Sequence, residues 1–338
     1  MSEAVAIFGN TIARNLQEIS FDSRSLEEPG WWAVTQTFEG EFAAFRFQDV
    51  SVFEELPRSS GHLAKRGKWH SSMSEDQYKS AVEMLRDDIA RGWVYQANLC
   101  RVLTSFSDEA IDPLELYVRL QTHNPSPHGG LLHVPEHDVV VVSASPELFI
   151  SRKHNQLASS PIKGTATQAS ELLAKDNAEN IMIVDLVRND LAQVCETGSV
   201  HVDDLLRVEE HPGLVHLVSD IVGNVAADIT WAQILKALTP PGSVSGAPKS
   251  SALEVIGRLE LSPRGIYCGA FGWVDTLTQT ASIAVAIRTF WQSKNGNGYD
   301  LHFGTGAGIT WGSEPQGEWH ETQLKAERLL SIVDGRLG

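Results

Sequence analysis

The chain has 338 residues, with 27 Lys and Arg against 43 Asp and Glu, and its net charge is −16. A surface this acidic repels a nucleic-acid backbone and an anionic lipid headgroup, so we expect neither a nucleic-acid nor a membrane partner. A hydrophobic content of 42% is enough for a sizeable core and excludes global disorder. If the ligand is a small anion, the site must reverse the sign of the charge locally.

The sequence also predicts the compartment. No run of 18 apolar residues is present and the first 30 residues hold no long apolar stretch, so we expect no spanning helix and no signal peptide. The three cysteines, Cys100, Cys195 and Cys268, lack the CxxC spacing of a metal site and are odd in number. They are typical of buried free thiols in a reducing cytoplasm, which is where we expect the protein.

The first predicted elements are two strands within residues 31–52, joined by a turn at Glu39-Gly40. A polar stretch over residues 57–76 follows and is the likeliest internal boundary. Ser74 then predicts the cap of a helix that extends to Arg91, because Val82, Leu85 and Ile89 recur at helical spacing.

Further predicted strands are Leu131–Val134, Val139–Ser143, Leu148–Arg152, Val200–Val202, Ala270–Val274, Ala281–Phe290 and Asp300–Phe303. Further predicted helices are Pro113–Gln121, Glu179–Val194, Trp231–Ala237, Pro248–Leu259 and Gln316–Val333. Several strands follow one another through short polar turns, which favours antiparallel pairing. We therefore predict an α+β fold with large, mostly antiparallel sheets, formed by one domain over residues 1–338.

A glycine-rich segment, Gly304–Thr310, follows the last predicted strand. Its GxGxG spacing and the absence of a surrounding βαβ unit argue against a dinucleotide site. The segment is either a tight turn or a stretch of bare backbone N–H groups that a small anion can approach.

Acidic residues occur as pairs on two predicted helices. Asp176 and Glu179 lie three residues apart, as do Glu318 and Glu321, and Lys325 follows one turn later. Carboxylates in this arrangement can hold Mg²⁺ through direct ligands and ordered waters, or they can be solvated surface charges.

Four single residues have a chemical and an ordinary interpretation. Lys163 is a nucleophile if it is desolvated, and otherwise a loop lysine. Glu147 is a proton donor if it is buried, and otherwise a turn carboxylate. Arg288 interrupts an apolar strand and points either inward to a carboxylate or outward to solvent. His216, in an apolar run, is either a core histidine or a catalytic one.

Several segments in their order along the chain resemble one family, the chorismate-binding enzymes, and most closely component I of the aminodeoxychorismate synthases. The matching segments are 94–99, 144–150, 161–165, 179–190, 216–223, 241–249, 267–274, 286–289, 304–310 and 317–325. The resemblance covers residues 74–338, which it makes the catalytic core, and it implies a shortened sheet-forming portion over residues 1–73.

The resemblance assigns roles position by position. It implies that Glu179 and Glu321 bind Mg²⁺ directly, and that Asp176 and Glu318 hold its waters. It makes Glu147 the general acid for the C4 hydroxyl of chorismate, Lys163 the nucleophile, and His216 an active-site histidine. The implied substrate contacts are Arg288, Tyr267, Lys325, Gly164, Thr165, Gly304, Thr305, Gly306, Ala307 and Gly308.

Two positions separate the branches of the family. Anthranilate and isochorismate synthases typically carry Ala at the position of Lys163, and isochorismate and salicylate synthases carry a Lys base where this chain has Gln96. The resemblance therefore implies amination of chorismate at C4, with ammonia from a separate glutamine amidotransferase subunit, in the synthesis of para-aminobenzoate for folate. The alternatives are component I of an anthranilate synthase and a chorismate-binding subunit without activity.

Overall fold

The structure is a computed structural model and describes residues 3–166, 168–172, 174–211 and 214–334. The strands are β1 (Val5–Phe8), β2 (Thr11–Ser20), β3 (Trp31–Gln36), β4 (Phe42–Val52), β5 (His70–Ser71), β6 (Gln96–Ser107), β7 (Gly130–Val134), β8 (Val139–Ser143), β9 (Leu148–Lys153), β10 (Gln156–Ser160), β11 (Ile162–Ala166), β12 (His201–His211), β13 (Leu214–Asn224), β14 (Gly246–Ala247), β15 (Ala270–Asp275), β16 (Thr280–Val285), β17 (Thr289–Asn295) and β18 (Gly298–Ile309). The helices are α1 (Glu75–Ala90), α2 (Pro113–His123), α3 (Ala174–Ala192), α4 (Trp231–Leu238), α5 (Lys249–Leu259) and α6 (Pro315–Asp334), with short 3₁₀ turns η1 (Ser23–Glu27), η2 (Pro135–His137), η3 (Ala169–Glu171) and η4 (Gly242–Val244).

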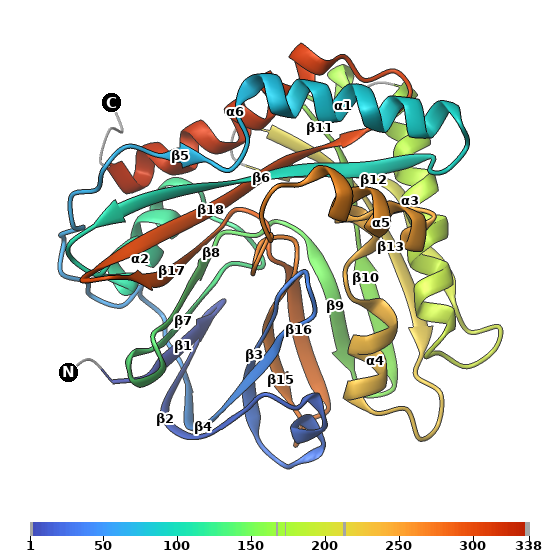
Figure 1. Ribbon diagram of the computed structural model, residues 1–338. Helices are drawn as coiled ribbons and strands as arrows, with labels where there is room; N and C mark the ends of the chain where they lie inside the picture. Colours follow the sequence, from blue (N-terminus) through green and yellow to red (C-terminus); the bar gives the residue numbers. More distant parts are fainter. Residues whose placement is uncertain (1–2, 167, 173, 212–213, 335–338) are drawn as a thin grey trace.

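The strands form one continuous sheet in which every pairing among the described residues is antiparallel (Figure 1). Neighbouring strands follow the order β12, β13, β10, β9, β16, β15, β3, β4, β2, β1, β7, β8, β17, β18 and β6. The N-terminal strands β1–β4 therefore lie in the middle of this order, between β15 and β7. The predicted class, α+β with large antiparallel sheets, is confirmed.

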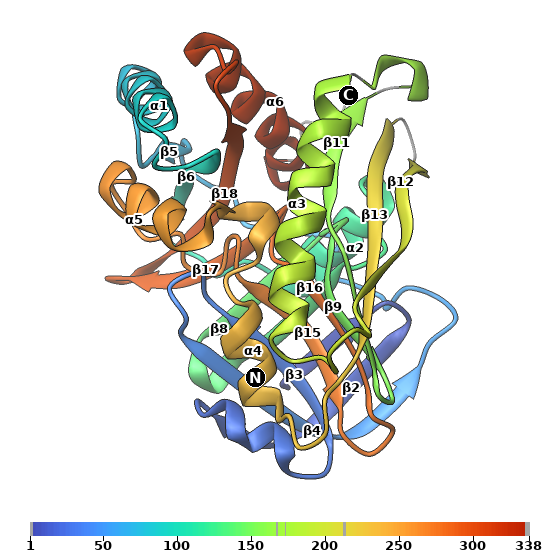
Figure 2. The same cartoon turned by 90° about the vertical axis from the view of Figure 1, so that its right-hand side faces the viewer.

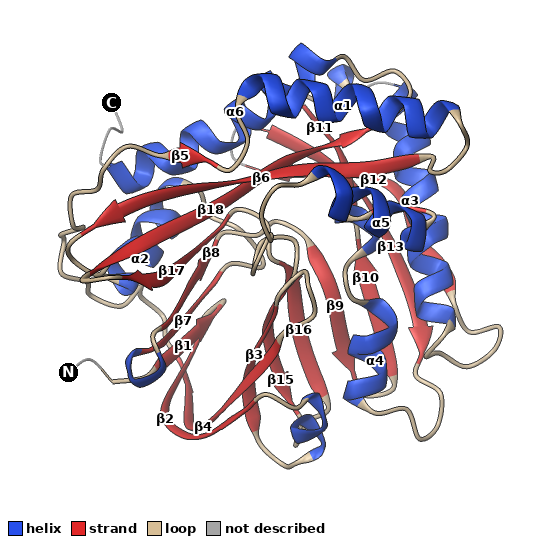
Figure 3. Ribbon diagram, in the orientation of Figure 1, coloured by secondary structure: helices blue, strands red, loops and turns tan. Residues whose placement is uncertain are grey.

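Helices cover the sheet as separate groups (Figure 3). α1, α5 and α6 pack over β6 and β18, whereas α3 lies along β11 and β13 (Figure 2). α1 begins as the sequence predicts, because the Ser74 side chain accepts from the backbone N–H of Gln77 in a capping box. None of the described helices is long and apolar enough to cross a membrane. The three cysteines are free and buried.

Several predicted elements have different bounds in the structure. The predicted strand Ala281–Phe290 is divided into β16 and β17, because Arg288 between them has a left-handed backbone with φ of +52°. The predicted strand Val200–Val202 is only the beginning of β12, which extends to His211 and forms a long hairpin with β13. The polar residues of β12 obscured its length in the sequence.

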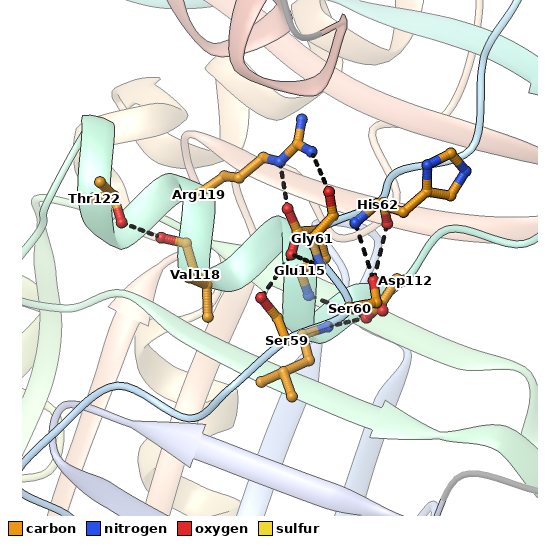
Figure 4. A network of polar contacts seen from close by, with 10 residues as sticks. Ser59, Ser60, Gly61, His62, Asp112, Glu115, Val118, Arg119 and Thr122 are labelled. Atoms are coloured by element: carbon orange, nitrogen blue, oxygen red, sulfur yellow. Dashed lines mark hydrogen bonds and ion pairs between the residues drawn. The ribbon is translucent and has the colours of Figure 1, made fainter.

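The polar stretch 57–76 is tied to the rest of the chain through a buried carboxylate (Figure 4). Glu115, in the first turn of α2, accepts from the Ser59 hydroxyl at 2.6 Å and from the Gly61 N–H at 2.8 Å. Arg119 forms an ion pair with the same carboxylate at 2.6 Å. Burial opposes ionisation of Glu115, but these hydrogen bonds outweigh burial and lower its pKa.

Glu115→Ala is therefore expected to lower the free energy of unfolding by about 2 kcal/mol, because it removes the buried carboxylate that accepts from the partly buried Ser59 and pairs with Arg119. Urea denaturation at pH 7 measures the loss, and Glu109→Ala, an exposed acid, is the control. Because the folded-state pKa is lowered, the contribution of Glu115 is present above its unfolded pKa and declines as the pH falls through the folded value. An equal loss in both variants would contradict the assignment.

Candidate active site

Glu147 lies in the segment between β8 and β9 and is only 4% exposed. Its carboxylate accepts hydrogen bonds from Ser243, in η4, and from the backbone N–H of Ile162, at the start of β11. Burial raises the pKa of Glu147 to about 7, against the opposing effect of these hydrogen bonds and of the nearby Lys163. A carboxyl group with this pKa holds a proton in a substantial fraction of molecules at neutral pH, as a general acid requires.

Lys163 follows Ile162 on β11, where the pairing with β13 has an irregular register between Ile162 and Thr165. Gly164 occupies this irregularity with φ of +96°, a conformation that a side chain at this position would strain. Removal from water lowers the pKa of Lys163, although Glu147, Glu179 and Glu321 favour its charged form. The structure therefore gives Lys163 a partly buried, acid-flanked environment in which an amine can act as a nucleophile.

Arg288 lies between β16 and β17, beside the segment that carries Glu147. Its carbonyl oxygen accepts from the N–H of Ala144 at 3.0 Å, which holds the left-handed turn against the end of β8. Burial is the main cause that lowers the pKa of Arg288, followed by repulsion from Arg328, and Glu147 acts in the opposite direction. The Arg288 guanidinium therefore lies close enough to Glu147 to interact with its charge. This favours the interpretation in which Arg288 points inward to a carboxylate over the one in which it points to solvent.

Lys163 also lies within electrostatic reach of acidic residues on α3 and α6. Glu179 and Glu321 both act electrostatically on Lys163, as does Lys325. Lys325 forms an ion pair with Glu321 at 2.6 Å and donates to the carbonyl oxygen of Gly306 at 3.2 Å. Two helices thus present carboxylates to the same ammonium group.

Carboxylate oxygens are the donors that Mg²⁺ prefers, so the chemistry of Glu179, Glu318 and Glu321 fits the predicted metal. The residues that the structure describes contain no group of three or more metal-ligating side chains close enough to hold an ion. The side chain of Asp176, the fourth predicted ligand, lies outside the described part of the chain, as does that of Thr165. The magnesium site stays a prediction.

The glycine-rich segment is neither a turn nor a loop. It is the second half of β18, paired with β6 from Gly304 opposite Val102 to Ile309 opposite Ala97. The glycines allow large groups to approach the strand. A Cβ on Gly304 would lie 1.9 Å from Cγ of Tyr267, and one on Gly306 would lie 2.5 Å from Sγ of Cys100.

Gly304→Ala is therefore expected to displace the Tyr267 ring and raise the KM for the substrate about tenfold or more, because the ring has no room beside a methyl group. Gly312→Ala is the matched control, since a Cβ there meets nothing within 4 Å. Steady-state kinetics and the thermal midpoint of both variants measure the effect. Identical behaviour of the two variants would show that Tyr267 does not depend on Gly304.

Three other predicted site residues, Thr305, Ala307 and His216, have side chains in different surroundings. The Thr305 hydroxyl donates to the carbonyl oxygen of Thr322 at 2.9 Å and so joins β18 to α6. The Ala307 side chain is part of a hydrophobic cluster with residues of α1 and α5. His216 is 1% exposed on β13 and pairs with Thr165 of β11, next to the irregularity that carries Lys163.

Three further residues lie at this site and are not among the site residues predicted from the sequence. Ser243, which hydrogen-bonds to Glu147, belongs to a motif that the resemblance includes, but the motif alone does not identify the hydroxyl as a partner of the acid. Asn98 donates from Nδ2 to the Ser243 carbonyl oxygen at 3.5 Å. Gln96, compared above only as a replaced base, is completely buried beside Gly308.

The class of this molecule is an α+β protein with an acid–amine site, in which a large antiparallel sheet brings a buried acid and a partly buried lysine together. The profile of the chorismate binding enzyme family matches residues 22–331. The chain therefore belongs to the chorismate-binding enzyme family.

Relatives in this family carry two different names. An anthranilate synthase component 1 of Haloarcula marismortui is 35% identical over 308 residues, which is 87% of this chain and 56% of that protein. An aminodeoxychorismate synthase of Streptomyces pristinaespiralis is 38% identical over 277 residues, which is 78% of this chain and 37% of that protein. The chain thus spans roughly a third to three fifths of the length of such relatives.

Solved structures share the fold. Anthranilate synthase component I from Streptococcus pneumoniae has a TM-score of 0.72 and 25% identity, over 98% of this chain and 80% of that one. MenF, the menaquinone-specific isochorismate synthase from Escherichia coli, has a TM-score of 0.80 and 18% identity, over 98% of this chain and 88% of that one. The second likeness concerns the fold alone.

Proposed function

We propose that the protein catalyses the Mg²⁺-dependent amination of chorismate at C4, giving 4-amino-4-deoxychorismate. The observation that supports this proposal is the juxtaposition of the buried Glu147 and the partly buried Lys163, whose pKa values are shifted in opposite directions, upward for the acid and downward for the amine. A raised pKa keeps a proton on the acid and a lowered pKa favours the neutral amine, so the two groups can protonate and attack one substrate together.

In the first step the Nζ lone pair of Lys163 forms a bond to C2 of chorismate. Both ring double bonds shift, the bond from C4 to its hydroxyl breaks, and Glu147 gives its proton to the departing oxygen, which leaves as water. Hydroxide is a poor leaving group, so this proton transfer is required. Ser243 and the Ile162 N–H hold the resulting carboxylate.

In the second step ammonia forms a bond to C4, both ring double bonds shift back, and the bond from C2 to Nζ of Lys163 breaks. The proton that ammonia must lose passes to the Glu147 carboxylate, which restores the acid. The balance is one chorismate and one ammonia converted to one aminodeoxychorismate and one water.

Glu179 and Glu321 would hold Mg²⁺ directly, with Glu318 and Asp176 on its waters. When bound, the ion supplies positive charge for the ring carboxylate of the substrate. Chorismate is a dianion, and Arg288 and Lys325 would bind its negative charge with the cationic groups of the chain itself. We further propose that ammonia comes from a separate glutamine amidotransferase subunit, and that the product serves the synthesis of para-aminobenzoate and folate.

A second candidate function is that of component I of an anthranilate synthase. It is favoured by the names of several relatives of similar identity, such as those from Haloarcula and from Neisseria meningitidis. In that reaction amination is followed by loss of pyruvate and aromatisation. The two functions differ in their product and are separated by one assay.

The test is incubation of the purified protein with chorismate, MgCl₂ and ammonium chloride, with identification of the product by mass spectrometry. The proposal predicts a product that keeps its enolpyruvyl arm and carries an amino group at C4, and it predicts no turnover when EDTA replaces MgCl₂. Anthranilate as the main product would establish the second candidate. No turnover by folded protein that binds chorismate would indicate a binding subunit without activity.

A further inference from the structure

Arg101 is a buried arginine that no described acid neutralises. It lies on β6 opposite Thr305 of β18 and is 2% exposed. Among the described residues its hydrogen bonds all go to neutral side chains, and burial is the main cause that lowers its pKa to about 10. Because a guanidinium loses its hydration when it is buried, an arginine here costs free energy that a nonpolar side chain would not. Its presence indicates a task that a nonpolar side chain cannot perform.

The guanidinium of Arg101 holds one turn of α6 at three points. Nε donates to Oγ1 of Thr322 at 3.0 Å, and Nη2 donates to Oε1 of Gln323 at 2.9 Å. Cζ lies over the Trp319 ring, 4.2 Å from its centroid. The remaining bond, from Nη1 to the Ser71 hydroxyl at 3.1 Å, ties the same group to β5. Because a planar guanidinium makes directional bonds, these contacts oppose rotation of α6 about its axis.

A second polar contact between the sheet and this turn constrains the rotation less. The Thr305 hydroxyl donates to the carbonyl oxygen of Thr322 at 2.9 Å. Backbone atoms lie only about 2 Å from a helix axis, so a rotation displaces them little. Arg101 contacts side chains, which lie farther from the axis and are displaced more by the same rotation.

The rotation of α6 determines where its acidic residues point. Glu318 directly precedes Trp319. Glu321 directly precedes Thr322. Each acid is thus fixed relative to a side chain that Arg101 contacts. The ends of long side chains lie about 6 Å from a helix axis, and a rotation of about 20° would move them by about 2 Å. Mg²⁺ requires nearly ideal octahedral geometry, so a displacement of this size would separate a ligand from the ion.

We propose that Arg101 is a positioning residue that fixes the rotation of α6 and so directs Glu321 and Lys325 at the metal and the substrate. This inference rests on the proposed function, in which Glu321 binds Mg²⁺. Glu321 and Lys325 both act electrostatically on Lys163, so their direction matters at the reacting end of the site. Loss of the Arg101 guanidinium is therefore expected to weaken binding rather than folding.

The partners of Arg101 would not become buried unsatisfied groups without it. Ser71 and Gln323 are exposed, so water can replace the guanidinium there. The Thr322 hydroxyl keeps its own bond to the carbonyl oxygen of Trp319, at 2.8 Å. Replacing a buried charge by a nonpolar side chain of similar volume is often neutral for stability. Arg101→Met is therefore expected to fold with a thermal midpoint within about 4 °C of the native value.

The test compares Arg101→Met, Thr322→Val and the native protein by titration calorimetry with MgCl₂ and by steady-state kinetics with ammonium chloride. We expect Arg101→Met to raise the Kd for Mg²⁺ and the KM for chorismate about tenfold or more, the usual cost of losing a group that orients a metal ligand. Thr322→Val keeps the shape of the side chain without its hydroxyl and is expected to raise both about threefold. In the double variant Thr322→Val is expected to add little, because both changes break the same contact. Arg14→Met, at an exposed arginine of β2, is the control.

The outcomes separate this inference from the proposed function. If the native protein binds no Mg²⁺ or forms no aminated product, the proposed function fails and this inference with it. If the native protein aminates chorismate and folded Arg101→Met keeps the native Kd for Mg²⁺, only the role of Arg101 is overturned. If Arg101→Met is strongly destabilised, Thr322→Val decides, and an unchanged Kd in that variant would likewise overturn the role.

Discussion

Lys163→Ala is expected to lower kcat for the ammonia-dependent reaction about a hundredfold or more. Without the amine no bond to C2 forms, so ammonia must displace the C4 hydroxyl without covalent assistance. The KM for chorismate is expected to change little, because in the proposed mechanism Arg288, Lys325 and the metal would provide most of the charge that binds the dianion. Initial rates with ammonium chloride measure both values.

Lys153→Ala is the matched control, since Lys153 is an exposed lysine at the end of β9, on the strand that leads to the hairpin with β10. It is expected to retain native rates. Full activity of Lys163→Ala would show that the amine is not a nucleophile and that its burial has another cause.

Glu147→Gln is expected to lower kcat by a factor of about 10² to 10⁴, the usual loss when a general acid is removed. The amide has nearly the same shape, but it has no proton to give to the departing hydroxyl. Glu136→Gln, an exposed acid in η2, is the control and is expected to retain native rates.

The pH dependence provides a second readout for Glu147. The acid must be protonated, and its pKa is about 7, so kcat/KM of the native enzyme is expected to fall as the pH rises through about 7. Lys163 must instead be neutral, so its ionisation changes the rate in the opposite direction. In Glu147→Gln the alkaline limb is expected to disappear. If that limb persists in the variant, the acid is another group.

The sequence predicted the elements with a strong local pattern. α1, with its cap at Ser74, and strands such as β8 agree within a residue or two, because hydrophobic spacing and capping act over a few residues. β12 was underestimated, since its side chains are mostly polar and its pairing with β13 is a tertiary contact. The glycine segment was misjudged because the close approach of Tyr267 and Cys100 to β18 is likewise tertiary.

The residues of the candidate site could likewise be predicted only in part from the sequence. The alternatives for Lys163, Glu147 and Arg288 could be written from the sequence, but spacing alone could not choose between them. What favours one alternative is burial, together with contacts between distant segments, such as Ser243 with Glu147. No local pattern predicts that an arginine such as Arg101 is buried against α6, because this depends on the packing of β6 against a helix far along the chain.

The net charge of −16 includes carboxylates of the candidate site. Glu179 and Glu321 belong to the acidic excess, yet they lie close enough to Lys163 to favour its charged form. With Mg²⁺ on these carboxylates the local charge would reverse and a dianion could bind. Without the ion the same groups would repel chorismate, which is why the proposed reaction depends on the metal.

The most direct test of the central claim, covalent catalysis by Lys163, is mass spectrometry of the protein after incubation with chorismate and MgCl₂ in the absence of ammonia. The account predicts an added mass equal to chorismate less one water, located by peptide mapping on Lys163 and absent from Lys163→Ala. An enzyme that aminates chorismate in the presence of ammonia, yet never carries this mass on Lys163 under single-turnover conditions, would contradict it.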